Sequence, residues 1–165
     1  MVAVGLALSG KAFAADDVTE AKATLAVFLK TDPDMARVLN SAAGYVVFPS
    51  VGKAAVGVGG AHGNGILFEH GTATHRVSMT QVTVGLALGG QSFAEVIFFE
   101  TPQTLIDFRK GNFAMSANVS AVALTAGASK AAKYTNGVMV FTATKSGLMF
   151  EASVGGQKFT LKPLH

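Results

Sequence analysis

The sequence contains no cysteine and no tryptophan, and only two of its 165 residues are tyrosine. Without cysteine the chain can form no disulfide, carry no reactive thiolate and hold no cysteine-linked acyl anchor. Its thirteen lysines and arginines are scattered, and the longest basic run is Arg109-Lys110. Because nucleic-acid-binding proteins usually carry a dense basic stripe, the sequence predicts no nucleic-acid partner.

The composition is instead that of a folded domain rich in turns. Half of the residues are apolar, 14% are charged, and the mean hydropathy is +0.42. This balance excludes a disordered chain and supports one domain with a sizeable core. Nineteen glycines are too many for a helical bundle, and they favour tight turns between closely packed strands.

The first fourteen residues resemble a targeting segment. Val2 to Ser9 is a short apolar run, and Ala12-Phe13-Ala14 has the A-x-A form of a cleavage site. We therefore predict a signal peptide over residues 1–14, a single domain over 15–165, and a periplasmic or secreted location. The charged n-region is missing, so the start is either truncated or misassigned. A buried N-terminal segment is the alternative.

Two amphipathic helices are expected at the start of the domain. Asp17 and Glu20 have the spacing of a capping box, and apolar residues recur at helical spacing as far as Lys30. A second helix is expected to begin at Asp32-Pro33, where a capping residue precedes proline. Both helices need a partner surface for their apolar faces.

Short β-type runs bounded by glycine, proline and asparagine fill most of the remaining sequence. The segments 76–89 and 92–100 are expected to form a long hairpin around Gly89-Gly90-Gln91. Thr101-Pro102 predicts a short helix to about Lys110. Further strands are expected over 44–49, 54–61, 66–69, 112–126, 138–144, 148–154 and 159–162. The predicted fold class is α+β, with N-terminal helices packed on a curved, mostly antiparallel, barrel-like sheet and one short helix inserted.

The sequence contains few patterns typical of catalytic or metal-binding sites. The glycines between Gly57 and Gly65 match no phosphate loop, and the four histidines lack the helical spacing of a zinc pair. We therefore predict no enzyme, no cofactor, no metal site and no catalytic residue. A hydrolase using Glu95 or Glu151 is an alternative, against which stands a simple cross-strand pairing of these carboxylates.

Several motifs together resemble the SYLF domain family. They are the opening G-Y-V-V-F-P at residues 44–49, M-T-Q-V-T-V-G at 79–85, the Gly89-Gly90-Gln91 turn and G-L-M-F-E-A-S at 147–153. The resemblance runs from about Asp17 to the C-terminus. It implies a lipid-binding module: eukaryotic members bind phosphoinositide membranes, some bind actin, and bacterial members are exported proteins or lipoproteins.

The resemblance also implies which residues would contact lipid. The family's N-terminal amphipathic segment corresponds to 18–30, with Lys22 and Lys30 as its cations, and Lys53 is the other transferred position. Apart from the resemblance, the basic residues Arg109-Lys110 and Lys130-Lys133 are second-choice contacts, and solvated helix ends are the competing interpretation. The acidic residues at the start of the first helix depart from the strongly basic family pattern. A helix whose apolar face simply docks on the sheet is the competing interpretation.

These observations predict a non-catalytic protein that binds anionic phospholipid membranes through basic residues and an amphipathic surface. The headgroups bound within the family are phosphoinositide-like, which bacterial membranes usually lack. The alternative is an envelope protein whose partner is another protein, bound through an exposed sheet edge without any dependence on lipid.

Overall fold

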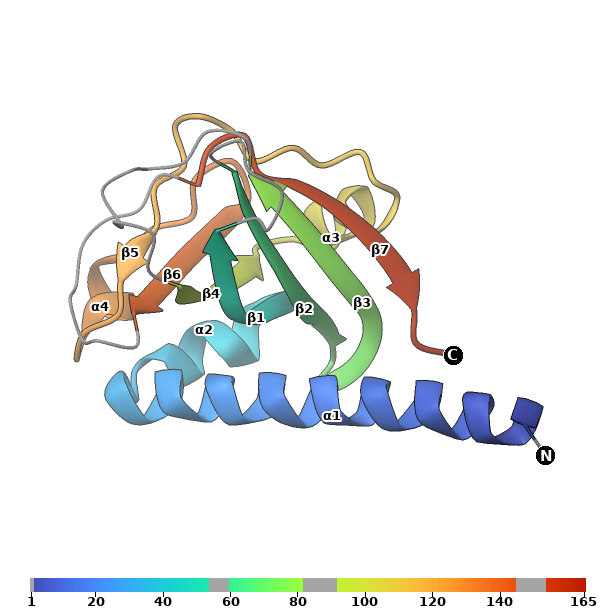
Figure 1. Ribbon diagram of the computed structural model, residues 1–165. Coiled ribbons are helices and arrows are strands. Elements are labelled where there is room, and N and C mark those ends of the chain that lie inside the picture. The colour runs from blue at the N-terminus through green and yellow to red at the C-terminus, as the bar shows by residue number, and fades with distance from the viewer. Residues whose placement is uncertain (1, 54–59, 82–91, 145–153) are drawn as a thin grey trace.

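The computed structural model describes residues 2–53, 60–81, 92–144 and 154–165 (Figure 1). Its helices are α1 (Val2–Thr31), α2 (Met35–Ser41), α3 (Pro102–Arg109) and α4 (Ala128–Ala131). Its strands are β1 (Gly44–Lys53), β2 (Ala61–Glu69), β3 (Thr72–Gln81), β4 (Phe93–Phe99), β5 (Val122–Ala123), β6 (Val138–Thr144) and β7 (Lys158–Pro163). The α+β class is confirmed.

The strands form one sheet in the order β5-β6-β4-β1-β2-β3-β7. Each pairing is antiparallel except that of β5 with β6. Among the described residues the sheet is open, with β5 and β7 at its two edges, so the expected barrel-like closure is not confirmed. The expected pairing of 76–89 with 92–100 is also absent there, because β3 lies between β2 and β7 and β4 lies between β1 and β6.

Both faces of the sheet are buried over much of its area, because successive strand residues point to opposite sides. Tyr45 and Val47 belong to the cluster beneath α1, α2 and α4, which also contains Phe28. Val46 and Phe48 belong to the cluster on the other face, beneath α3. The central strands are therefore sandwiched between two separate apolar cores, and α1 runs along one side of the sheet (Figure 1).

The helix boundaries differ from those expected at two places. α1 begins at Val2, so Asp17 lies inside the helix and forms an ion pair with Arg76 on β3, at 3.0 Å, in place of a capping box. α2 begins at Met35 after Asp34, which makes no side-chain capping bond. By contrast, the expected cap of α3 is confirmed, since the Thr104 backbone N–H donates to the Thr101 hydroxyl at 3.2 Å.

Asp32 stabilises a distant part of the chain. Its carboxylate is fully buried and accepts the backbone N–H groups of Gly127 at 3.2 Å and Ser129 at 2.8 Å. These groups begin α4, where unpaired N–H donors favour a carboxylate. The hydrogen bonds of Asp32 therefore link the α1–α2 connection to the start of α4.

The segment 112–126, expected to be a strand, forms one only at Val122–Ala123. Most of it is irregular and covers the sheet, with Met115, Val119 and Ala121 buried in the core beneath α3. The Met115 backbone bonds to Gly156 and Gln157, which lie just before β7. The strands expected over 54–61 and 148–154 lie mostly outside the described residues.

Candidate functional site

α1 turns two different faces to its surroundings. Ala21, Leu25 and Phe28 are buried against the sheet at the i, i+4, i+7 spacing of a helical stripe. The apolar face of the predicted amphipathic segment is therefore core, and it is not free to enter a membrane in this structure. Any surface that α1 offers to a partner must be its outward face.

The outward face combines cations with small apolar residues. Lys22 and Lys30 are both exposed and lie about two helical turns apart. Val27, three residues before Lys30, is 59% exposed, and it is the only exposed large apolar residue among those whose side chains the structure describes, which excludes residues 1–14. The remaining exposed positions between the two lysines are Ala23 and Ala26. We call this surface, Lys22 to Lys30, the outward face of α1.

Arg109 and Lys110 lie on the opposite layer. α3 packs through Leu105 and Phe108 on the face of the sheet away from α1. A flat membrane touching the outward face of α1 therefore cannot also touch Arg109 and Lys110. Lys53 ends β1, and its side chain lies outside the described residues. The candidate cations thus do not form one continuous surface.

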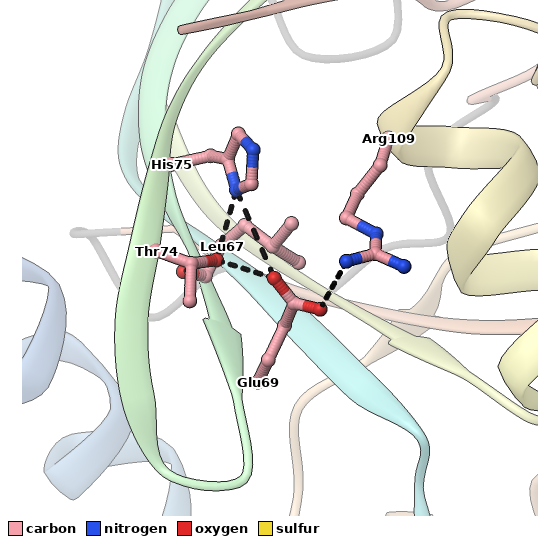
Figure 2. Close-up of polar contacts among 5 residues, drawn as sticks. All are labelled: Leu67, Glu69, Thr74, His75 and Arg109. Atoms are coloured by element: carbon pink, nitrogen blue, oxygen red, sulfur yellow. Dashed lines mark hydrogen bonds and ion pairs between the residues drawn. The ribbon is translucent and has the colours of Figure 1, made fainter. Parts of the chain in front are cut away.

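Arg109 is held in a polar cluster. Its Nη1 atom lies 3.1 Å from Oε1 of Glu69, a side chain only 15% exposed (Figure 2). The other oxygen of Glu69 accepts the Thr74 hydroxyl at 2.7 Å and lies 3.8 Å from Nδ1 of His75. Thr74 reaches Glu69 because the β2–β3 register shifts beside it, and such a bulge redirects a side chain. The cluster ties the β2–β3 turn to α3.

Replacing Arg109 with methionine is expected to lower the free energy of unfolding by about 1 kcal/mol. Methionine keeps an apolar stem but leaves the Glu69 carboxylate without its cation, and the exposure of Arg109 keeps the effect modest. Urea denaturation followed by circular dichroism measures the change. Lys110→Met is the matched control, because Lys110 is exposed and makes no ion pair among the described residues. Equal losses in both variants would contradict the role given to Glu69.

Glu95, the residue of the alternative hydrolase, is fully buried in the middle of β4. Its Oε1 atom accepts the Gln157 amide at 2.9 Å, and the same amide lies 3.3 Å from Oε1 of Gln81. Burial raises the pKa of Glu95 to about 7, and the Gln157 hydrogen bond opposes that rise. Glu95 lines neither of the two surface clefts described below. Glu151 lies outside the described residues.

Two clefts open on the α1 side of the sheet. One, of about 220 Å³, lies between α1 and β1–β3, with Asp17, Glu20 and Arg76 at its border. The other, of about 300 Å³, lies between α2 and the β2–β3 turn and is lined by Tyr45 and His70 among others. Burial raises the pKa of Tyr45. Neither cleft contains any of the predicted site residues.

Within the described ranges, no three histidine, aspartate or glutamate side chains gather as metal ligands. In the same part of the chain, no helix combines the length and the apolar character needed to cross a bilayer. In the residues that the structure describes, the geometry presents an α+β domain with a cationic helix face, an unpaired sheet edge and the two clefts above.

Comparison with known proteins identifies the class to which this domain belongs. The family described as "Ysc84: Las17-binding protein actin regulator" matches residues 80–163, just over half of the chain. The chain belongs to this family, the Ysc84 or SYLF family, which confirms the resemblance seen in the sequence.

A curated relative extends the similarity toward the N-terminus. "Beta cell expansion factor A" of Aeromonas veronii is 27% identical over 143 residues, which cover 86% of this chain and 54% of the relative. The chain therefore spans about half the length of the relative that it matches. This relative's name describes an effect on beta cells and assigns no activity to any residue here.

Proposed function

We propose that this chain is a non-catalytic protein that binds anionic phospholipid membranes through the outward face of α1. The observation that carries the proposal is the exposure of Lys22, Val27 and Lys30 on one face, opposite the face docked on the sheet. A cationic face with a small apolar centre suits the boundary between headgroups and acyl chains. Membership of a family associated with lipid and protein binding supports it.

Charge along α1 limits where the membrane would lie. Asp16 and Glu20 are exposed on the N-terminal side of Lys22, Glu20 by two residues and Asp16 by six, and anionic lipid would repel them. The proposed contact therefore covers the C-terminal half of the helix, from Lys22 to Lys30. The proposal includes a periplasmic or secreted location, peripheral to the membrane, for which the A-x-A pattern at residues 12–14 is the support.

Vesicle flotation tests the proposal. The chain is expected to float with vesicles containing phosphatidylglycerol or cardiolipin, and less as salt is added, because salt screens exposed charges. Each lysine near an anionic surface contributes about 1 kcal/mol, so the double substitution Lys22→Glu and Lys30→Glu should weaken binding by at least about 30-fold. Phosphatidylcholine vesicles should bind the chain poorly.

The matched control is Lys110→Glu with Lys158→Glu, which changes the net charge equally at exposed positions outside α1. This control should keep most of the binding. Equal weakening in both double variants would show that net charge, and not the outward face of α1, governs the interaction. Absence of flotation with every lipid would overturn the proposal and favour the protein-partner alternative.

A further inference from the structure

β7 has a free edge. In the described part of the sheet it pairs with β3 alone, and it is the outermost strand on its side (Figure 1). An unpaired strand edge offers a row of backbone donors and acceptors to another extended chain. What such a chain must look like follows from the register and side chains of β7.

The register shows which backbone groups point outward. The Leu164 N–H donates to the Thr74 carbonyl at 3.0 Å, so this pair belongs to the hydrogen-bonded rungs between β3 and the C-terminal segment. Hydrogen-bonded residues alternate along an antiparallel strand, and the N–H and C=O groups of Phe159 and Leu161 therefore face the open side. The residues bonded to β3 in the same alternation are Lys158, Thr160 and Lys162.

Proline marks the end of this row. By the same alternation, the backbone of Pro163 faces outward like that of Phe159 and Leu161, but proline has no N–H to donate. Proline is tolerated in a strand at such an outward position on an edge. With respect to the part of the chain that the structure describes, the edge therefore presents two unpaired N–H donors, which is enough to register a short segment of about five residues.

The side chains of β7 alternate in character as well as in direction. Lys158, Thr160 and Lys162 are exposed on one face, whereas Phe159 and Leu161 are partly buried on the other. Phe159 and Leu161 pack against the apolar core beneath α3. A strand added at this edge would meet lysines on one face and apolar side chains on the other.

The lysines make a second copy of this chain a poor occupant. An antiparallel pairing of two β7 strands centred on Thr160 would place Lys158 of each copy opposite Lys162 of the other. Like charges directly opposite each other destabilise a strand pair. The same lysines fit a strand that carries carboxylates at those two positions.

We propose that the β7 edge binds an extended acidic peptide segment of a protein partner as an additional antiparallel strand. The segment has the pattern acidic–apolar–polar–apolar–acidic, with its carboxylates opposite Lys158 and Lys162 and its apolar residues beside Phe159 and Leu161. Main-chain bonds to the two outward N–H groups supply affinity, and the side-chain pattern supplies selectivity. This site is separate from the outward face of α1.

The test uses the full chain and two fluorescein-labelled peptides, Gly-Glu-Val-Thr-Val-Glu-Gly and Gly-Lys-Val-Thr-Val-Lys-Gly. The acidic peptide is expected to bind at least about tenfold more tightly in fluorescence anisotropy. The double variant Lys158→Glu and Lys162→Glu should reverse this preference, because its edge then matches the basic peptide. Amide exchange at Phe159 and Leu161 should slow in the complex, because their N–H groups become hydrogen-bonded.

Lys110→Glu with Lys133→Glu is the control, since both lysines are exposed and neither lies in the sheet. It should keep the preference for the acidic peptide. The proposal is overturned if neither peptide binds, if both double variants behave alike, or if exchange at Phe159 and Leu161 is unchanged on binding. Loss of vesicle binding in the β7 variant with unchanged peptide binding would assign these lysines to lipid instead.

Discussion

Replacing Glu95 with glutamine should remove a pH dependence of stability that the native chain shows between about pH 4.5 and pH 7. The pKa of Glu95 rises from 4.5 to about 7 on burial, so the folded state holds a proton that the unfolded state has lost. The free energy of unfolding therefore has its full value, as far as Glu95 is concerned, below pH 4.5. It declines as the pH rises to about 7. By linkage, the decline amounts to about 3 kcal/mol.

Glutamine has nearly the same shape as glutamate and stays neutral. The free energy of unfolding of Glu95→Gln should therefore be almost independent of pH over this range. At pH 8 it should be more stable than the native chain by up to about 3 kcal/mol, and at pH 5 the difference should be small. The glutamine amide also offers a donor to Oε1 of Gln157, a buried oxygen without a hydrogen-bond partner among the described residues.

Urea denaturation at pH 5, 6, 7 and 8 measures these profiles. Glu100→Gln is the control, because Glu100 is exposed and follows the same strand. Its profile should run parallel to that of the native chain. A Glu95→Gln profile that also runs parallel to the native one would show that Glu95 is ionised in the folded state, with a partner that neutralises its charge.

The second large effect is expected at Gly65, in the middle of β2. A Cβ atom there would clash with the Val47 carbonyl oxygen and would lie 2.7 Å from Cδ1 of Phe48. Both neighbours are buried, so neither can move without disturbing the core. Gly65→Ala should therefore cost about 3 kcal/mol, at the upper end of overpacking effects.

Gly52→Ala provides a matched comparison from β1. A Cβ atom at Gly52 would have its nearest neighbour in the Ser92 side chain, at 3.6 Å, which is ordinary van der Waals contact. Its cost should stay within about 0.5 kcal/mol. Thermal and urea unfolding of the two variants would separate them clearly. Similar stabilities would show that β2 shifts to admit the methyl group, contrary to the close packing described above.

Local chemistry in the sequence predicted part of this fold. The α3 helix follows from Thr101-Pro102, because both the capping hydroxyl and the proline act within one turn. The exposure of Lys22 and Lys30 follows from helical periodicity once Leu25 and Phe28 are assigned to the core. In these cases the deciding interactions lie within a few residues along the chain.

The parts of the fold that the sequence did not predict depend on interactions between segments that are distant along the chain. The glycine-rich turn at 89–91 does not specify which strands pair, and the sheet instead places β1 beside β4 and β3 beside β7. The apolar residues of 112–126 fit a strand, yet they cover the sheet as irregular chain, because β propensity reflects a half-buried surface more than a backbone preference. The Glu69 partner of Arg109, forty residues away, gave no signal in the sequence.

The strand order also sets the sequence of events when the chain folds. β1 to β3 form two adjacent hairpins, whereas β7 closes onto β3 only after some eighty further residues. Loop closure over such a distance is slow, so a sheet nucleus around β1–β3 should precede it. During that interval β3 itself is the sheet edge, and its own Val77 and Met79 are not yet covered by Leu161 and Phe159, their partners on β7. The C-terminal residues thus act as the last cover of a growing sheet, and chains stalled before that step would be prone to aggregate.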